Sequence, residues 1–247
     1  MIRRKFVGSA GSVLVSTLAL TLIAGCAPNQ EAVYVVGAQA RAGDDCTLAP
    51  DTYINRGNVD LSFSTGYTAA FQILNNLQMQ QAGSTNNGID NSEVQMRDVD
   101  VKLSFPQDPQ VAVDVANAGI PLEFNQILAS TSLPAQTRGT AFVEIPDVTL
   151  DAIGQSIGSR LGTDVRLDML LEVEFHARRS ANDGLNDAGI IDVRPFTLPV
   201  EICFACLRDC TGCTGNECIT RGPLEGTTVC GGVQDGQFIP ICEEPTG

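Results

Sequence analysis

The sequence has no tryptophan, a single histidine (His176) and few basic residues. Its 15 lysines and arginines are outnumbered by 29 aspartates and glutamates, which gives a formal net charge of −14. Nucleic-acid binding needs basic patches that neutralise phosphates, so this balance argues against a nucleic-acid partner. Stacking aromatic rings favour sugar binding, and the lack of tryptophan argues against a sugar-binding cleft.

Long amphipathic helical patterns are also scarce, and most of the chain alternates apolar and polar residues between turn signals. The alternating or apolar-rich stretches are 59–63, 67–77, 93–105, 111–115, 139–145, 164–176 and 190–204. Period two with one polar face is typical of antiparallel sheets that bury one side. The pattern predicts an all-β fold, an Ig-like antiparallel β-sandwich. A register break between Met96 and Val99 indicates a bulge, and Pro195 and Pro199 place the last strands on an edge or at a bend.

One segment has helical spacing instead. Leu150, Ile153, Ile157 and Leu161 lie three, four and four residues apart, which puts them on one helical face. We expect a short helix over about 150–161 that crosses one end of the sandwich, with Ile153 and Ile157 packed inward.

The amino terminus has the layout of an export signal. Three basic residues, Arg3, Arg4 and Lys5, precede an uncharged stretch over 6–24. A transmembrane anchor is the competing interpretation, but glycines and serines dilute the stretch. It ends in Ile23-Ala24-Gly25-Cys26, which resembles the lipobox of bacterial lipoproteins. The resemblance implies cleavage before Cys26, lipidation of Cys26 and, because Ala27 follows, an outer-membrane address, with the periplasmic or surface face left open.

Four regions follow from these patterns. We expect a signal peptide over 1–25, a tether over 26–45, a sandwich domain over 46–202 and a cysteine-rich tail over 203–247. Removal of 1–25 takes away three basic residues and no acidic one, which leaves a net charge of −17. We expect a monomer held at the membrane by its N-terminal lipid.

Eight cysteines remain besides Cys26, and seven of them lie in the tail. They are Cys46, Cys203, Cys206, Cys210, Cys213, Cys218, Cys230 and Cys242. Zinc ribbons separate two Cys-x2-Cys pairs by about 15–20 residues, and bacterial ferredoxins use Cys-x2-Cys-x2-Cys-x3-Cys-Pro; neither spacing matches. An even number of cysteines in an exported chain predicts disulfides rather than a metal or cofactor.

The tail has a physical need for such bonds. It has few strong apolar residues, and a small unit that buries little core is usually stapled, each disulfide adding about 2–4 kcal/mol. Seven is an odd number, so one tail cysteine is expected to pair with Cys46. Cys203 and Cys206 are the favoured partners because they lie nearest the sandwich, and the other pairings stay open.

A second resemblance rests on the residues that lead into the tail. Leu198, Pro199, Val200, Cys203, Cys206 and Leu207 form a stretch similar to one in uncharacterised bacterial lipoproteins with Ig-like domains. The resemblance covers roughly 60–210 and implies a fold but no activity.

Two catalytic patterns are present in isolation. Gly154-Gln155-Ser156-Ile157-Gly158 matches the nucleophile elbow Gly-x-Ser-x-Gly, with His176 as the available base. The motif lies inside the predicted helix rather than at a strand-to-helix turn, which favours two small residues packed on a sheet. Glu172 and Glu174 share one strand face, about 7 Å apart, a spacing seen in glycosidases, although such pairs are normally a solvated face.

The loop over 182–192 carries oxygen ligands suited to calcium, namely Asp183, Asn186, Asp187 and Asp192. Their spacing differs from the EF-hand loop, and such residues are also common in hairpin turns. We therefore expect a non-catalytic structural or protein-interaction module without catalytic, cofactor-binding or metal residues. The alternatives are a calcium-dependent adhesin-like domain and an extracytoplasmic hydrolase that uses Ser156 and His176.

Overall fold

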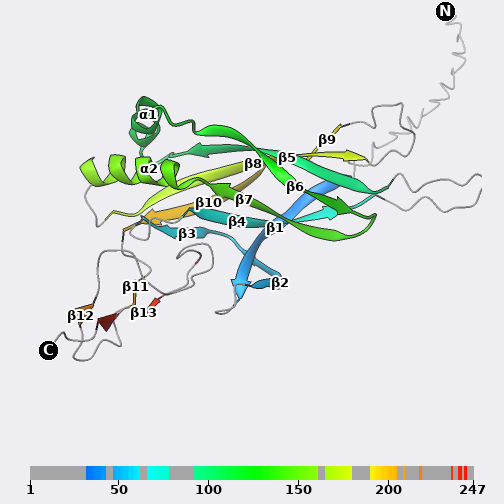
Figure 1. Ribbon diagram of the computed structural model, residues 1–247, viewed down its shortest axis with the longest axis horizontal. Helices are drawn as coiled ribbons and strands as arrows, with labels where there is room; N and C mark the ends of the chain where they lie inside the picture. The colour runs from blue at the N-terminus through cyan, green and yellow to red at the C-terminus, as the bar shows by residue number, and fades with distance from the viewer. Residues whose placement is uncertain are drawn as a thin grey trace, which may run out of the picture. The chain divides into compact units, whose positions relative to one another are not determined.

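The computed structural model describes most of the region between the N-terminal segment and the tail (Figure 1). The described residues are 32–42, 47–61, 66–77, 92–160, 165–179, 190–204, 208–209, 217–218, 235, 239–240 and 242–243. The predicted signal peptide and Cys26 lie outside these ranges. In the described part of the chain, no helix combines the length and the apolar character needed to cross a membrane.

Two sheets make up the body of the fold. The first has the order β2-β1-β4-β7, with β1 Val33–Ala42, β2 Thr47–Ile54, β4 Tyr67–Asn75 and β7 Arg138–Ile145. The second has the order β3-β10-β8-β5-β6, with β3 Gly57–Asp60, β5 Val94–Ser104, β6 Glu123–Leu133, β8 Leu167–Arg179 and β10 Phe196–Cys203, and β9 Ile190–Asp192 also pairs with β8. Within these two sheets the neighbouring strands are antiparallel except β3 and β10, which run parallel.

The core lies between the two sheets. Phe71 of β4, in the first sheet, meets Phe175 of β8 and Phe196 of β10, in the second, with ring centroids 5.8 Å apart and edge-to-face geometry in both pairs. Inward residues of β8 are buried at every second position from Leu167 to Ala177. Each fully buried Phe or Leu side chain contributes about 1.5–3 kcal/mol. The expectation of a mostly β, two-sheet sandwich is confirmed.

The predicted strand over 111–115 is wrong, because these residues form helix α1, Pro109–Asn117. The side chain of Asp108 accepts a hydrogen bond from the backbone N–H of Gln110, and Pro109 occupies the first turn, both favourable at a helix start. Val111 and Val115, four residues apart, are buried, whereas Val113 is 48% exposed. Valines at 111, 113 and 115 alternate as in a strand. In the helix only Val111 and Val115 face the core, and Val113 lies on the exposed side.

The second helix, α2 Asp147–Arg160, confirms the predicted one and starts three residues earlier. Leu150, Ile153 and Ile157 are buried as expected. α2 lies beside α1 at one end of the sandwich (Figure 1). The fold therefore has two helices in its described residues rather than one.

Within the segment 26–45, expected to be mostly a tether but with a possible short strand over 33–36, residues 33–42 form β1. This strand lies between β2 and β4. Gly37 is required there, because a Cβ at this position would lie 2.8 Å from a ring carbon of Tyr53. Gly37 is thus a packing requirement of the strand.

The expected bulge in β5 is confirmed, since its register with both neighbours shifts between Met96 and Asp98. The expectation for the prolines is half right. Pro195 lies at the bend between β9 and β10. Pro199 lies within β10, which is not an edge strand, but the pairing with β3 begins only at Val200.

Buried Asn75, at the end of β4, joins the two sheets. Its Nδ2 donates to the carbonyls of Ser92 (2.7 Å) and Leu133 (2.8 Å), and its Oδ1 accepts from the N–H of Leu77 (3.1 Å). The side chain is 0% exposed and all its polar atoms are used. A buried amide of this kind stabilises the fold only while every partner is present.

Two residues of the predicted tail, Cys203 and Asp235, have bonds that bear on the stability of the sandwich. Cys203, 2% exposed at the end of β10, is disulfide-bonded. Asp235 pairs with the edge of β3: its N–H donates to the Asn58 carbonyl (2.9 Å), and its Oδ1 accepts from the Asn58 N–H (3.1 Å) and from the hydroxyl of buried Tyr67 (3.0 Å). Asp235 therefore occupies backbone groups of Asn58 on the open edge of β3 and satisfies a buried hydroxyl.

Four short strands lie in the tail. They are β11 Arg208–Asp209, paired with β13 Ile239–Pro240, and β12 Glu217–Cys218, paired with β14 Cys242–Glu243. In the second pair the backbone of Cys218 lies opposite that of Cys242. The other predicted disulfide cysteines (Cys46, Cys206, Cys210, Cys213 and Cys230) lie outside the described residues, so the predicted pairing of Cys46 stays a prediction.

Candidate functional site

The outer face of the second sheet gathers acidic side chains from three adjacent strands. Side chains alternate between the two faces of a strand, so Asp100 and Lys102 of β5 and Glu172 and Glu174 of β8 point away from the core. The register pairs Asp100 with Glu174 and Lys102 with Glu172. The predicted placement of the two glutamates on one strand face is confirmed, and this surface is called the acidic face below.

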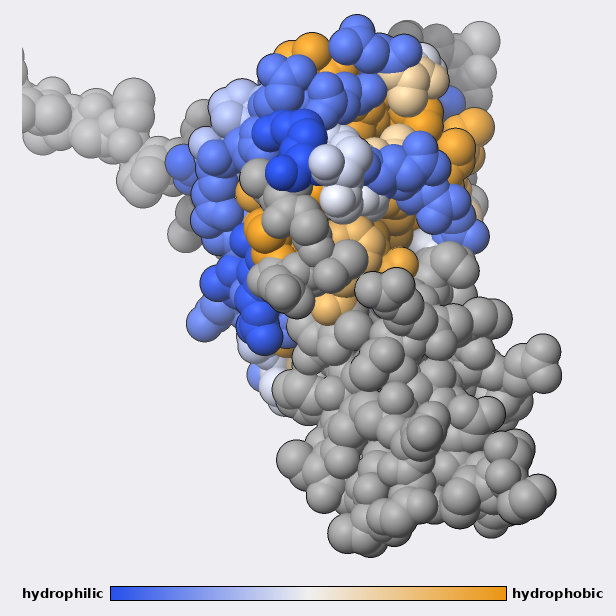
Figure 2. Space-filling view, turned by 90° about the vertical axis from the view of Figure 1, so that its left-hand side faces the viewer, coloured by the Kyte–Doolittle hydropathy of each residue, from blue (hydrophilic) through white to orange (hydrophobic). Residues whose placement is uncertain are grey.

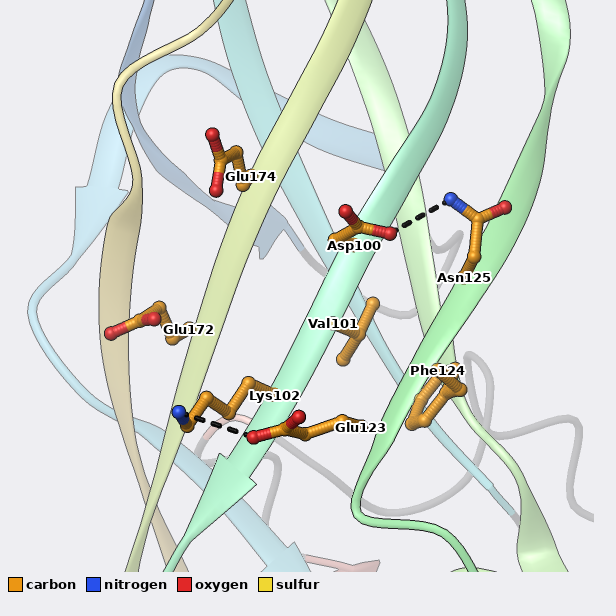
Figure 3. Close-up of a pocket in the computed structure, with 8 residues that line it drawn as sticks. All are labelled: Asp100, Val101, Lys102, Glu123, Phe124, Asn125, Glu172 and Glu174. Atoms are coloured by element: carbon orange, nitrogen blue, oxygen red, sulfur yellow. Dashed lines mark hydrogen bonds and ion pairs between the residues drawn. The ribbon is translucent and has the colours of Figure 1, made fainter.

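β6 completes two rows across the acidic face. One row holds Glu174, Asp100 and Asn125, and the other Glu172, Lys102 and Glu123 (Figure 3). Between them lies an open hollow of about 400 Å³. Its lining consists of Asp100, Val101, Lys102, Glu123, Phe124, Asn125, Glu172 and Glu174.

Only some of these charges are neutralised locally. Lys102 Nζ lies 3.1 Å from Glu123 Oε1, and this hydrogen bond raises the pKa of Lys102. Asn125 Nδ2 donates to Asp98 Oδ1 (3.0 Å) and Asp100 Oδ1 (2.9 Å). Four carboxylates therefore share one ammonium group in the hollow, so its surface is electronegative and suited to a cationic ligand.

His176 joins three strands at one edge of this face. Its Nε2 lies 3.0 Å from Asp100 Oδ2 on β5, and its Nδ1 lies 3.1 Å from Asp192 Oδ1 on β9. Partial burial lowers the pKa of His176, but the hydrogen bonds to the two carboxylates outweigh burial and raise it overall. The hydrogen bonds of Asn125 and His176 lower the pKa of Asp100. The imidazolium form, with two N–H donors, satisfies both carboxylates at once.

The His176 clamp predicts a specific dependence of stability on pH. Because the pKa of His176 is higher in the folded state than the ordinary 6.5, its contribution is complete below pH 6.5 and is lost as pH rises through the folded-state pKa. We expect about 1 kcal/mol or less, since Asp100 and Asp192 are mostly exposed. Urea unfolding from pH 6 to 9 measures it, and His176→Gln removes that slope. An unchanged slope in the variant contradicts the clamp.

Ser156 and His176, the two residues of the hydrolase hypothesis, have separate partners. Ser156, on α2, is 6% exposed and its Oγ donates to Asp114 Oδ2 of α1 (2.6 Å). α2 and β9, the strand that pairs with His176, lie at opposite ends of the sandwich (Figure 1). The structure does not bring this serine and this histidine together.

The surroundings of Ser156 are those of a structural contact. The hydrogen bonds of Ser156 and Gln110 lower the pKa of Asp114, which also lies 3.2 Å from Arg160. A carboxylate with a lowered pKa is a weak base, so it does not activate a serine. Gly154 supports the packing interpretation of the motif, because a Cβ there would lie 3.3 Å from Leu61.

The calcium hypothesis concerns residues that the structure describes only in part. Asp183, Asn186 and Asp187 lie outside the described residues, and Asp192 bonds His176. Among the described residues, no group of three or more histidine, cysteine, aspartate or glutamate side chains is arranged to hold a metal ion.

Comparisons with known proteins were made at the level of sequence and of structure. No protein-family model and no curated protein matches the chain. Among solved structures, one likeness is to the solution structure of a late embryogenesis abundant (LEA) protein, at 11% identity and TM-score 0.34, over 69% of this chain and 68% of that one. Another is to an ASH/PapD-like domain of human CEP192, at 6% identity and TM-score 0.25, over 67% of this chain and 97% of that one. Such low values say nothing about function.

Proposed function

We propose that the chain is an outer-membrane lipoprotein whose sandwich serves as a non-catalytic protein-interaction module. The basic residues at 3–5, the uncharged stretch and the lipobox-like Ile23-Ala24-Gly25-Cys26 support the anchor. In this proposal Cys26 carries the lipid and becomes the first residue of the mature chain. The anchor holds the domain at the membrane, where it encounters partners by diffusion in the membrane plane.

The acidic face is the observation that carries the interaction role. Its carboxylates project from β5 and β8, strands that are paired on both sides over much of their length. Side chains on such strands are held in place before a partner arrives, which lowers the entropy cost of binding. A partner of complementary chemistry presents lysines or arginines, whose attraction speeds association and gives salt dependence.

The same contacts favour binding over hydrolysis. Glu172 and Glu174 lie on an open face beside Lys102, and Ser156 hydrogen-bonds an ion-paired carboxylate. An open, wet surface screens charges and offers little of the preorganised, water-excluding environment on which catalysis depends. Protein recognition has no such requirement.

Mass spectrometry of the mature protein and a Cys26→Ala variant test the anchor. We expect wild type to begin at Cys26, to carry acyl chains and to sediment with membranes, and the variant to lose the acyl mass. Three acyl chains hold far more strongly than one, because each buried CH2 contributes about 0.8 kcal/mol. A mature chain that keeps Met1 and carries no lipid contradicts the proposal.

Charge reversal tests the acidic face. Cross-linking on intact membranes compares wild type with Glu172→Lys/Glu174→Lys. The control is Glu144→Lys/Asp151→Lys, which makes the same charge change at exposed positions on β7 and α2. We expect wild type and the control variant to form a cross-linked complex with a partner. Added salt should lower the yield of this complex, and Glu172→Lys/Glu174→Lys should abolish it. Equal capture by all three proteins contradicts an acidic-face partner.

A further inference from the structure

We propose that the sandwich end where β1 begins is a lipid-contact surface, so that the anchored domain stands with this end on the membrane and its helices away from it. This inference rests on the proposed lipidation of Cys26. The occupant is an anionic phospholipid surface, and the arguments are the length of the connecting chain, the position of its end and the distribution of charge.

The connecting chain is short. β1 begins at Val33, so only seven residues, 26–32, separate the proposed lipid from the first strand. Seven extended residues span at most about 25 Å. Had the predicted tether of 20 residues been present, the domain would tumble freely above the surface. The observed start of β1 keeps it close to the lipid and brings one end of it nearest.

That end is defined by the register. Val33 of β1 pairs with Asn75, and Val94 of β5 pairs with Leu133 and with Arg179. Asn75 also hydrogen-bonds the carbonyl of Leu133. The start of β1 therefore lies at the same end as the last residues of β4, β6 and β8. We call this the arginine end.

Three of the arginines of this acidic chain cluster at the arginine end, where Asp51, Glu93 and Asp192 are the acidic residues of the described part of the chain. Arg178 and Arg179 finish β8, and Arg138 starts β7, where it pairs with Asp51. Glu93, next to β5, hydrogen-bonds Ser132. Arg179 is exposed and has no ion pair among the described residues. Each arginine near an anionic leaflet is attracted to the negatively charged lipid headgroups.

An exposed apolar residue accompanies these arginines. Ile190, the first residue of β9, is 70% exposed and pairs with Arg178 across the ladder. An apolar side chain beside cationic ones is the combination that inserts shallowly at an interface while the cations bind headgroups.

The opposite end has the reverse character. The strands there carry Glu123, Glu144 and Asp168 at or near their termini, of which Glu123 pairs with Lys102 and Asp168 with Arg56. Asp108 and Asp114 of the α1 region share Arg160, and α2 adds exposed Asp147 and Asp151, so the acidic residues named here outnumber their basic partners. Figure 2 looks onto this end and shows hydrophilic side chains over much of it, with smaller apolar patches between them. An anionic leaflet repels such a surface, so the charge distribution favours one orientation.

A single introduced tryptophan reports which end touches lipid, because the natural chain has none. The reporter is Ile190→Trp and the matched control is Val148→Trp, at a 58% exposed position of α2. Each lipidated variant is reconstituted into vesicles that contain phosphatidylglycerol, with or without lipids brominated on the acyl chain. We expect bromine to quench the fluorescence of Ile190→Trp strongly and that of Val148→Trp little. Equal quenching of the two variants, or quenching of Val148→Trp alone, overturns the inference.

Arg179→Glu in the Ile190→Trp background tests the role of charge. It changes the local charge by two units, so the population with this end on anionic vesicles falls on the order of tenfold. Arg166→Glu, the same change next to the opposite end of β8, leaves quenching unaltered. Unchanged quenching in Arg179→Glu overturns the electrostatic part. If mass spectrometry finds no lipid on Cys26, both proposals fail, whereas a lipidated chain with equal quenching of both reporters rejects only this one.

Discussion

Replacing Asn75 with alanine is expected to lower the free energy of unfolding by roughly 3 kcal/mol or more. The change removes both donors to the carbonyls of Ser92 and Leu133 and the acceptor for the N–H of Leu77. These groups sit around a side chain that is 0% exposed, so water does not replace the lost bonds without rearrangement. The measurement is urea unfolding followed by far-ultraviolet circular dichroism.

Two further variants identify the cause. Asn76→Ala is the matched control, because Asn76 forms its hydrogen bonds with Ala32 and Gln136 through its backbone. We expect this variant to change the free energy of unfolding by about 0.5 kcal/mol or less. Asn75→Asp keeps the acceptor for Leu77 but places a carboxylate oxygen against two carbonyls. Burial raises the pKa of that carboxyl, so the variant should regain stability as pH falls. If Asn75→Ala and Asn76→Ala cost the same, the bridge between the sheets is not what matters.

The sequence predicted strands well wherever the pattern contained inward apolar residues at every second position. β5 and β8 are such strands, and even the bulge after Met96 was visible as a register break. The strand predicted at 111–115 was wrong because this segment is short, and its apolar residues fit both the period of a strand and that of a helix. Asp108 and Pro109 were the signals for a helix start, and they precede the valines that looked like a strand.

β6 was missed for a different reason. Its inward-side position 126 holds glutamine and its outward position 127 holds isoleucine, which is 84% exposed. Gln126 has a role at the seam between the sheets, since its Nε2 donates to the Phe142 carbonyl (3.2 Å) and its Oε1 accepts from the Glu144 N–H (3.0 Å). The side chain thereby occupies hydrogen-bonding groups at the edge of β7. Gln126 therefore breaks the alternation of apolar and polar residues in β6. Its hydrogen-bond partners on β7 cannot be predicted from the sequence alone.

The sequence predicted which side chains of the candidate site share one face of a strand, but not which strands lie next to each other. Alternation already put Glu172 and Glu174 on one side of a strand. It did not reveal that β5 lies beside β8 in a register that sets Asp100 against Glu174 and within reach of His176. Register depends on long-range strand pairing, so residues 76 positions apart in the chain become neighbours only in the fold. The same holds for Asp235, whose carboxylate meets Tyr67 from the tail.

Loss of the Cys203 disulfide is expected to cost about 2–5 kcal/mol, the usual range for a small exported domain. Cys203 is at the end of β10, buried, and lies beside β3, where its Sγ is 3.5 Å from the Val59 carbonyl oxygen. A covalent bond here limits the unfolded chain and secures the start of the tail. Urea unfolding of wild type and Cys203→Ala measures the loss, and peptide mapping without reductant identifies the partner among Cys46 and the other tail cysteines.

Asp235→Ala distinguishes the bond from the packing around it. Asp235 is the second point that holds the tail, through Asn58 and Tyr67, and its loss alone should cost about 1–3 kcal/mol. A disulfide from Cys203 to another tail cysteine keeps the tail close, so the carboxylate site is easily reoccupied. Without it, Asp235 binds only as a distant segment of the chain, so the effect of Asp235→Ala should shrink in the Cys203→Ala background. Additive costs mean that the two contacts act independently, and a free thiol at Cys203 in wild-type protein purified without reductant refutes the disulfide itself.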